Sequence, residues 1–193
     1  MAFIESISNE DVAALPAVQY EGDIVVVDTP QSLSDACQHL AQQSIIGFDT
    51  ETRPSFTAGV VNKVALLQLY GGGKCFLIRL NRVQISKALT DILHNPEILK
   101  IGAAVKNDIA GLNKLRHFTA GGFIDLQDIV EKYNIKDKSL RKISGIVLGR
   151  KVSKAQRLSN WEAKLLTPQQ QLYAATDAWV CVEIYKELLN SNR

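Results

Sequence analysis

The sequence has little of several features that would assign it to a special class of protein. Only three of its 193 residues are cysteines, Cys37, Cys75 and Cys181, and they lie far apart without a CxxC pair. This spacing argues against a structural zinc site and against a secreted fold held by disulfides. No apolar run is long enough to span a bilayer, and no basic and apolar signal segment begins the chain. We therefore expect no membrane partner and a cytoplasmic protein, or a nuclear one in a eukaryote.

Charge and composition exclude several further classes. The formal net charge is only +2, so a surface that binds nucleic acid must be a local patch rather than a property of the whole chain. Hydrophobic residues make up 46% and charged residues 22%, which is the balance of an ordinary globular protein. The three histidines are scattered at positions that match no metal-binding spacing. A length of 193 residues suits one domain with a sizeable core, and no protein partner is inferred.

The pattern of apolar residues predicts a single α/β domain preceded by a short arm. Residues 1–22 are weakly patterned and are interpreted as the arm, whereas residues 23–193 form the domain. Apolar and β-branched runs predict strands at residues 24–27, 45–51, 63–70, 75–80, 99–103 and 123–124. Helices are predicted after Asn9 and Thr29 and over residues 84–93, 107–117, 126–133, 140–148 and 167–189. A glycine-linked hairpin followed by strand–helix alternation implies a mixed five- to six-stranded sheet flanked by helices.

The first candidate for chemistry is the segment FDTET, residues 48–52. Side chains two apart in a strand point to the same face, so Asp49 and Glu51 project together from the end of an apolar strand. Two adjacent carboxylates are costly there unless a cation lies between them, and hard oxygen ligands suit Mg²⁺ or Mn²⁺. For this pair alone, a strand end that merely meets solvent stays open as the alternative.

The second candidate is the pair Tyr173 and Asp177 in the segment YAATDA. Residues four apart on a helix lie on one face, about one turn from each other. The neighbouring alanines keep this helix slim, so it can approach another element closely. An unpaired carboxylate is unusual among these small apolar residues, although a solvent-facing stripe would also explain the pair.

The third candidate is Asp108, which follows a short apolar strand in the segment Lys106-Asn107-Asp108. Ligands gather at the carboxyl ends of strands in open α/β sheets, so this position favours a site. Asparagine and aspartate are also common helix caps, and an aspartate at this position, taken alone, would be a cap in most proteins.

The three segments together resemble a known family. FDTET, KIGAAVKNDIAGL at residues 100–112 and YAATDA are similar, in that order, to the three exonuclease motifs of the DEDD nucleases. The tyrosine four residues before the last aspartate matches the tyrosine subgroup, DEDDy. Residues 154–178, with SNWE and YAATDA, resemble the Werner-type exonuclease domain and the catalytic domain of ribonuclease D. The resemblance implies a ribonuclease-H-like fold and a metal-dependent 3′-5′ exonuclease that releases nucleoside 5′-monophosphates from DNA or RNA.

This resemblance also implies a role for each carboxylate. Two divalent cations, Mg²⁺ or Mn²⁺, would clamp the scissile phosphate, with Asp49 between both ions. Glu51 and Asp177 would hold the ion that activates water, and Asp108 would hold the other, directly or through water. Tyr173 would orient the attacking water, because a tyrosine with an ordinary pKa near ~10 is a poor general base.

Five further residues are candidates for binding the terminal nucleotide of the 3′ end and its phosphates. They are Thr50, Lys106, Asn107, Lys154 and Trp161. The Trp161 ring could stack on a base, but a core tryptophan that closes the final helix is an equally good interpretation. For the chain as a whole, the alternative function is a non-catalytic nucleic-acid-binding module on the same fold.

Overall fold

The computed structural model describes residues 3–57, 59 and 62–191. Its centre is a six-stranded sheet with the strand order β1-β4-β3-β2-β5-β6. The strands are β1 (Asp23–Val27), β2 (Ile45–Thr52), β3 (Val64–Gly71), β4 (Lys74–Arg79), β5 (Leu99–Gly102) and β6 (Phe123–Asp125). Only β3 runs antiparallel to its neighbours β2 and β4. The predicted α/β class and mixed sheet are therefore confirmed, with six strands.

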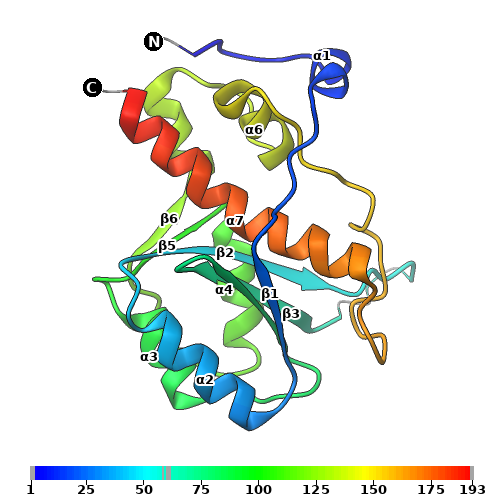
Figure 1. Ribbon diagram of the computed structural model, residues 1–193, viewed down its shortest axis with the longest axis vertical. Helices are drawn as coiled ribbons and strands as arrows, with labels where there is room; N and C mark the ends of the chain where they lie inside the picture. The colour runs from blue at the N-terminus through cyan, green and yellow to red at the C-terminus, as the bar shows by residue number, and fades with distance from the viewer. Residues whose placement is uncertain (1–2, 58, 60–61, 192–193) are drawn as a thin grey trace.

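Helices cover both faces of this sheet (Figure 1). One face packs against α2 (Pro30–Leu40), α3 (Lys87–His94) and α4 (Val105–Asn113). The long helix α7 (Pro168–Ser191) runs across the other face. Beside it lie the short α5 (Leu126–Ile129), a 3₁₀ turn η1 (Val130–Tyr133) and α6 (Leu140–Leu148), which share a core cluster with α7. In the described residues, no helix is long and apolar enough to cross a membrane.

Two local features confirm specific sequence predictions. Gly72 and Gly73 have φ of 59° and 80°, so they form the tight turn that joins β3 to β4. Both residues of such a turn need positive φ, which glycine adopts without strain. Helix α7 begins as predicted, because the Thr167 hydroxyl accepts a hydrogen bond from the Gln170 amide at 3.2 Å, and Pro168 is its first residue.

The close approach of α7 to β2 depends on a glycine. A Cβ at Gly47 would lie 1.9 Å from the main-chain oxygen of Ala178, which no side chain can tolerate. Ala174, Ala175 and Ala178 are completely buried along the same helix. Small residues on both elements therefore let the helix backbone rest on the strand, as the sequence of slim residues suggested.

Three predicted helices differ from the structure at their ends. The helix predicted over residues 84–93 begins only at Lys87, because the Ser86 hydroxyl accepts from the Leu89 amide and caps it. The helix predicted over residues 107–117 is α4, which starts two residues earlier and ends four earlier. Its Asn113 side chain bonds to the Ile109 carbonyl and to the Phe118 amide, which closes the last turn.

The helix predicted over residues 126–133 is divided between α5 and η1. It ends at Asn134, whose φ of 59° is left-handed and stops the helix. Asparagine tolerates this conformation better than most residues with a side chain, so the boundary follows from local chemistry.

The N-terminal arm is packed along the domain. Its α1 (Asn9–Ala14) includes the turn predicted after Asn9 and contacts α6, with Val12 completely buried. Farther on, the Tyr20 amide donates to the Thr176 hydroxyl of α7 at 3.1 Å. The Tyr20 ring also packs against Trp179 at 5.8 Å between centroids. The arm is therefore tied to the same helix that carries Asp177.

Gly47→Ala tests whether the contact between α7 and β2 holds the fold. We expect the variant to lose about 3 kcal/mol or more of its free energy of unfolding, because backbone atoms of Ala178 cannot move aside as a side chain can. The measurement is urea unfolding of both proteins without metal. Gly145→Ala in α6 is the matched control. Its Cβ would meet the flexible Leu15 side chain at 3.1 Å, so we expect a change within about 1 kcal/mol. Equal stability of the two variants would contradict this account of the helix contact.

Candidate metal centre

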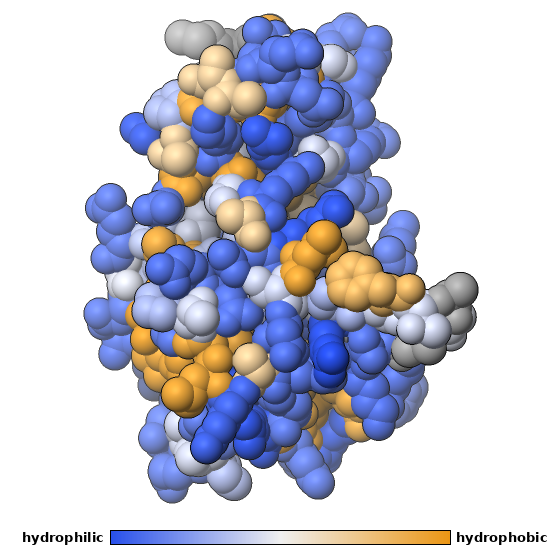
Figure 2. Space-filling model, turned by 90° about the vertical axis from the view of Figure 1, so that its right-hand side faces the viewer, coloured by the Kyte–Doolittle hydropathy of each residue, from blue (hydrophilic) through white to orange (hydrophobic). Residues whose placement is uncertain are grey.

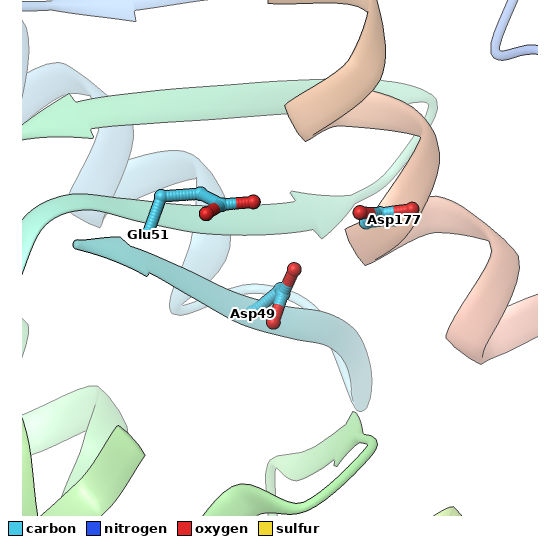
Figure 3. Close-up of side chains that lie close together, drawn as sticks. All are labelled: Asp49, Glu51 and Asp177. Atoms are coloured by element: carbon cyan, nitrogen blue, oxygen red, sulfur yellow. The ribbon is translucent and has the colours of Figure 1, made fainter. Parts of the chain in front are cut away.

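Three carboxylates converge where α7 crosses β2. Asp49 and Glu51 project from β2 on the α7 side of the sheet, and Asp177 projects toward them from α7 (Figure 3). One oxygen from each of the three lies within 4.8 Å of the others. Asp177 is only 6% exposed, and the other two side chains are half-buried. The structure therefore brings together three of the four predicted metal ligands from distant parts of the sequence.

The pKa values of this cluster are raised by burial and by mutual repulsion. Burial, followed by the charges of Asp177 and Asp108, raises the pKa of Glu51 to about 9. Burial also raises the pKa of Asp177 to about 7, against the effect of a hydrogen bond from Tyr173. The pKa of Asp49 lies well above its ordinary value because of burial and the charges of Asp177 and Glu51. Without a cation, the folded cluster therefore retains protons that free carboxyls would release at neutral pH.

Asp108 lies beside this cluster, on the first turn of α4. The Thr50 hydroxyl donates a hydrogen bond of 2.6 Å to its carboxylate. Burial raises the pKa of Asp108 to about 6, while this hydrogen bond lowers it. The Asp108 charge acts on both Asp49 and Glu51. Asp108 is not the cap of its helix, because the N-cap is Ala104. Thr50 was predicted to bind substrate, and in this structure its hydroxyl binds Asp108.

The position of α4 depends on Asp125, a residue that the sequence analysis missed. Its two carboxylate oxygens accept hydrogen bonds of 3.0 Å from the Ala104 and Val105 amides, and one of them also accepts from Gln127 at 2.9 Å. Ala104 has a φ of 61°, a left-handed conformation that is unfavourable for alanine. Asp125 at the end of β6 thereby caps α4 and α5 together and fixes the turn that presents Asp108.

Tyr173 lies one turn before Asp177 and hydrogen-bonds to its carboxylate. Burial and the charges of Asp177 and Glu51 raise the pKa of Tyr173 far above its ordinary value. The phenol therefore keeps its proton, so it can orient a neighbouring group but not act as a base.

Trp161 is completely buried, with its ring 6.0 Å from the Tyr173 ring. This burial corrects the expectation that Trp161 stacks on a base. The alternative of a core tryptophan beneath the final helix describes its position.

The other predicted substrate-binding residues lie on the surface. Lys106 and Asn107 are exposed on the first turn of α4, and Lys154 is exposed in the connection between α6 and α7. Arg157, in the same connection, lowers the pKa of Glu51 through its charge, so a cation lies near the cluster. Sequence reasoning placed this basic connection near the active face but did not select Arg157.

Two loops border the cluster and contact each other. Arg53, just after β2, forms a 3.3 Å ion pair with Glu162 of the α6–α7 connection. Figure 2 shows a largely hydrophilic face on this side of the molecule, with a few protruding apolar side chains. The same loops carry the exposed side chains of Phe56, Leu158 and Leu165. The two loops joined by the Arg53–Glu162 pair thus carry both charged and exposed apolar side chains.

A cavity of about 210 Å³ opens beside Tyr173 and Asp177. Val18 and Gln19 of the arm form part of its wall, opposite Leu172 of α7. The arm therefore contributes to the surroundings of the carboxylates, which its weak sequence pattern did not indicate.

The donor set fits a hard divalent cation. The four acidic side chains supply only carboxylate oxygens, the ligands that Mg²⁺ and Mn²⁺ prefer. The pKa values of Asp49 and Glu51 stay raised although Arg157 lowers that of Glu51, so the surrounding residues compensate the charges of the cluster only in part. A bound cation would supply the remainder, with Asp49, Glu51 and Asp177 as nearest ligands and Asp108 beside them.

Comparisons with known proteins agree with this site. A family model described as 3′-5′ exonuclease matches residues 24–192. The bifunctional 3′-5′ exonuclease/ATP-dependent helicase WRN of Mus musculus is 30% identical over 187 residues, covering 91% of this chain but 13% of that protein. A 3′-5′ exonuclease of Arabidopsis thaliana is 28% identical and covers 90% of this chain and 66% of that protein. The chain thus spans a small fraction of the mouse relative.

Solved structures show the same fold. The Nibbler EXO domain of Aedes aegypti has a TM-score of 0.81 and 25% identity, covering 90% of this chain and 92% of that one. RNase D of Escherichia coli has a TM-score of 0.75 and 23% identity, covering 88% of this chain and 46% of that one. These likenesses confirm the ribonuclease-H-like fold expected from the motifs.

The raised carboxyl pKa values predict how pH affects the metal-free protein. Asp108, Asp177 and Glu51 have pKa values of about 6, 7 and 9 in the folded state, against ordinary values of 3.8, 3.8 and 4.5. The folded state therefore binds more protons than the unfolded state, and this stability is lost as pH rises through the folded pKa values. We expect the free energy of unfolding in chelator to fall by several kcal/mol between about pH 5 and pH 8.5.

Mn²⁺ binding and Asp177→Asn provide the controls for this pH dependence. Saturating Mn²⁺ should flatten the decline, because a cation that binds only the folded state compensates the carboxylates. Asp177→Asn should also flatten it in chelator, since one of the repelling charges is absent. Urea unfolding at four pH values measures all three cases. A metal-free wild type that gains stability over this range would refute the linkage.

Proposed function

The chain belongs to the 3′-5′ exonuclease family, and on that premise we propose that it is a DEDDy-type enzyme that hydrolyses phosphodiester bonds at the 3′ end of DNA or RNA. The observation that carries this proposal is the convergence of Asp49, Glu51 and Asp177, with Asp108 beside them and Tyr173 bonded to Asp177. Buried like charges destabilise a folded protein unless a cation compensates them, so this convergence favours a metal-binding role. The products would be nucleoside 5′-monophosphates.

Metal ions supply the electrophilic part of this chemistry. Two divalent cations, Mg²⁺ or Mn²⁺, bound at the carboxylates would activate a water and stabilise the leaving oxygen. Asp49, Glu51 and Asp177 would hold these ions together with Asp108. Thr50 contributes by fixing the Asp108 carboxylate through its 2.6 Å hydrogen bond.

Tyr173 would orient the attacking water. Its phenol stays protonated because burial and neighbouring carboxylates raise its pKa, so it offers a hydrogen-bond donor and an oxygen acceptor at a fixed place. The phenol hydrogen-bonds to Asp177, which fixes its orientation beside the carboxylates. The proton lost by the water leaves through solvent or a neighbouring carboxylate rather than through the phenolate.

Surface residues around the carboxylates would bind the nucleic acid. Lys106, Asn107 and Lys154 are exposed and suited to phosphate contacts, and Arg157 adds a cation near Glu51. Phe56 is 87% exposed on the loop after β2, so it replaces the buried Trp161 as the candidate for stacking on a base. In this arrangement the charged side chains bind the phosphates of the nucleic acid, and the exposed apolar side chain contacts its bases.

A labelled-oligonucleotide assay tests the proposed activity and its polarity. With Mn²⁺ we expect stepwise shortening of a linear strand from its 3′-hydroxyl end, release of mononucleotides and no shortening in chelator. A circular single strand should resist, because it offers no 3′ end. A mobility shift without shortening would instead support the non-catalytic binding module, and cutting of the circle would contradict exonuclease polarity.

Tyr173→Phe tests the orienting role. Loss of the hydroxyl should lower kcat by roughly 10²–10⁴ while KM changes little, as for other positioned proton-handling groups. Tyr185→Phe on the same helix, away from the carboxylates, is the matched control and should keep wild-type kcat. Single-turnover kinetics at saturating Mn²⁺ measure both variants. Equal rates for the two would make Tyr173 a packing residue.

A further inference from the structure

Gln68 of β3 is a buried polar residue that the proposed function does not use. Its side chain is completely buried. Neither its Nε2 nor its Oε1 atom has a hydrogen-bond partner among the residues that the structure describes. A buried carboxamide normally bonds with both ends, and leaving it unpaired destabilises the folded state. Its presence at this position therefore needs an explanation.

The sheet register places Gln68 directly across from Asp49. The two residues are partners in the antiparallel pair of β2 and β3. Directly opposed side chains lie on the same face of a sheet, with Cβ atoms about 4.5–5.5 Å apart. A glutamine side chain can span that separation. Among the strand positions that face α7, Gln68 is thus the immediate lateral neighbour of the central carboxylate.

The other neighbours of Gln68 offer little to bond with. Leu66 lies two residues earlier on the same face, and Leu77 is its partner on β4. Both leucines are completely buried and belong to the same core cluster as the alanines of α7. A leucine or methionine at position 68 would complete this apolar surface without an unpaired amide. Of the two direct cross-strand partners of Gln68, Asp49 on β2 is therefore the polar one.

We propose that Gln68 is a positioning residue for Asp49, whose carboxylate accepts a hydrogen bond from the Gln68 amide in the metal-loaded protein. The inference rests on the proposed function, because it assigns the bond a use only when Asp49 is a metal ligand. A carboxylate that would hold a metal ion must keep one orientation, and a fixed N–H donor at its side restricts its rotation. Gln68 itself touches neither metal nor substrate.

Gln68→Met removes both amide groups while keeping a similar volume. We expect the metal-free variant to melt at the same temperature as wild type or higher, because an unpaired buried amide is lost. Its affinity for Mn²⁺, measured by the free-ion signal in electron paramagnetic resonance, should fall roughly 10–100-fold. At saturating Mn²⁺ its kcat should also fall, with KM for the oligonucleotide little changed. If Gln68 had only a structural role, its substitution would not weaken Mn²⁺ binding while leaving the melting temperature unchanged.

Leu69→Met and Gln68→Leu complete the experiment. Leu69 is buried in β3 on the opposite face, so its variant controls for repacking of the strand and should bind Mn²⁺ as wild type does. Gln68→Leu also removes the amide group but introduces a branched side chain, and it serves as the second variant if Gln68→Met folds poorly. Wild-type Mn²⁺ affinity in both folded Gln68 variants would overturn the proposal.

The wild-type protein separates this inference from the proposed function. If wild type binds Mn²⁺ but shortens no oligonucleotide, the exonuclease proposal fails, and weaker Mn²⁺ binding by the Gln68 variants still supports the positioning role. If wild type is active and the Gln68 variants equal it in affinity and kcat, only the positioning role fails. If wild type binds no Mn²⁺ at all, both are overturned.

Discussion

The contact between the backbone of α7 and the bare Cα of Gly47 determines the rest of the site. It allows a helix from the end of the chain to lie on a strand from its first third, close enough for Asp177 to reach Asp49 and Glu51. A side chain at position 47 would separate the two elements and disperse the carboxylates. The alanines of α7 serve the same end, because each larger residue would lift the helix from the sheet. Both the packing of α7 on β2 and the convergence of the carboxylates therefore require small residues where the helix crosses the strand.

The fold stabilises an arrangement of like charges that is unfavourable in itself. Burial and repulsion raise the carboxyl pKa values, and the apolar surroundings of α7 and β3 supply no cation to compensate. Two supports hold the ligands nonetheless. Thr50 bonds to Asp108, and Asp125 anchors the start of α4. The positions of Asp108 and of the start of α4 are thus fixed by hydrogen bonds within the fold.

Sequence reasoning predicted what depends on local pattern. Strand alternation placed Asp49 and Glu51 on one face, helical spacing placed Tyr173 beside Asp177, and the glycines marked the β3–β4 turn. It failed where a single side chain decides a boundary, as at Ser86 and Asn113. It left Trp161 open between stacking on a base and packing in the core, because a tryptophan in a polar stretch gives no sign of its burial. Gln68 and Asp125 were missed because their neighbours come from strand register and tertiary packing, which no sequence spacing reveals.

The placement of Asp177 on α7 has a consequence for how the protein is made. A ribosome that has synthesised β2, β3 and α4 has already produced Asp49, Glu51 and Asp108, yet these carboxylates face an uncovered sheet. The third carboxylate of the cluster and Tyr173 are synthesised only with α7, which must then dock over Gly47. A nascent or truncated chain therefore has an incomplete centre.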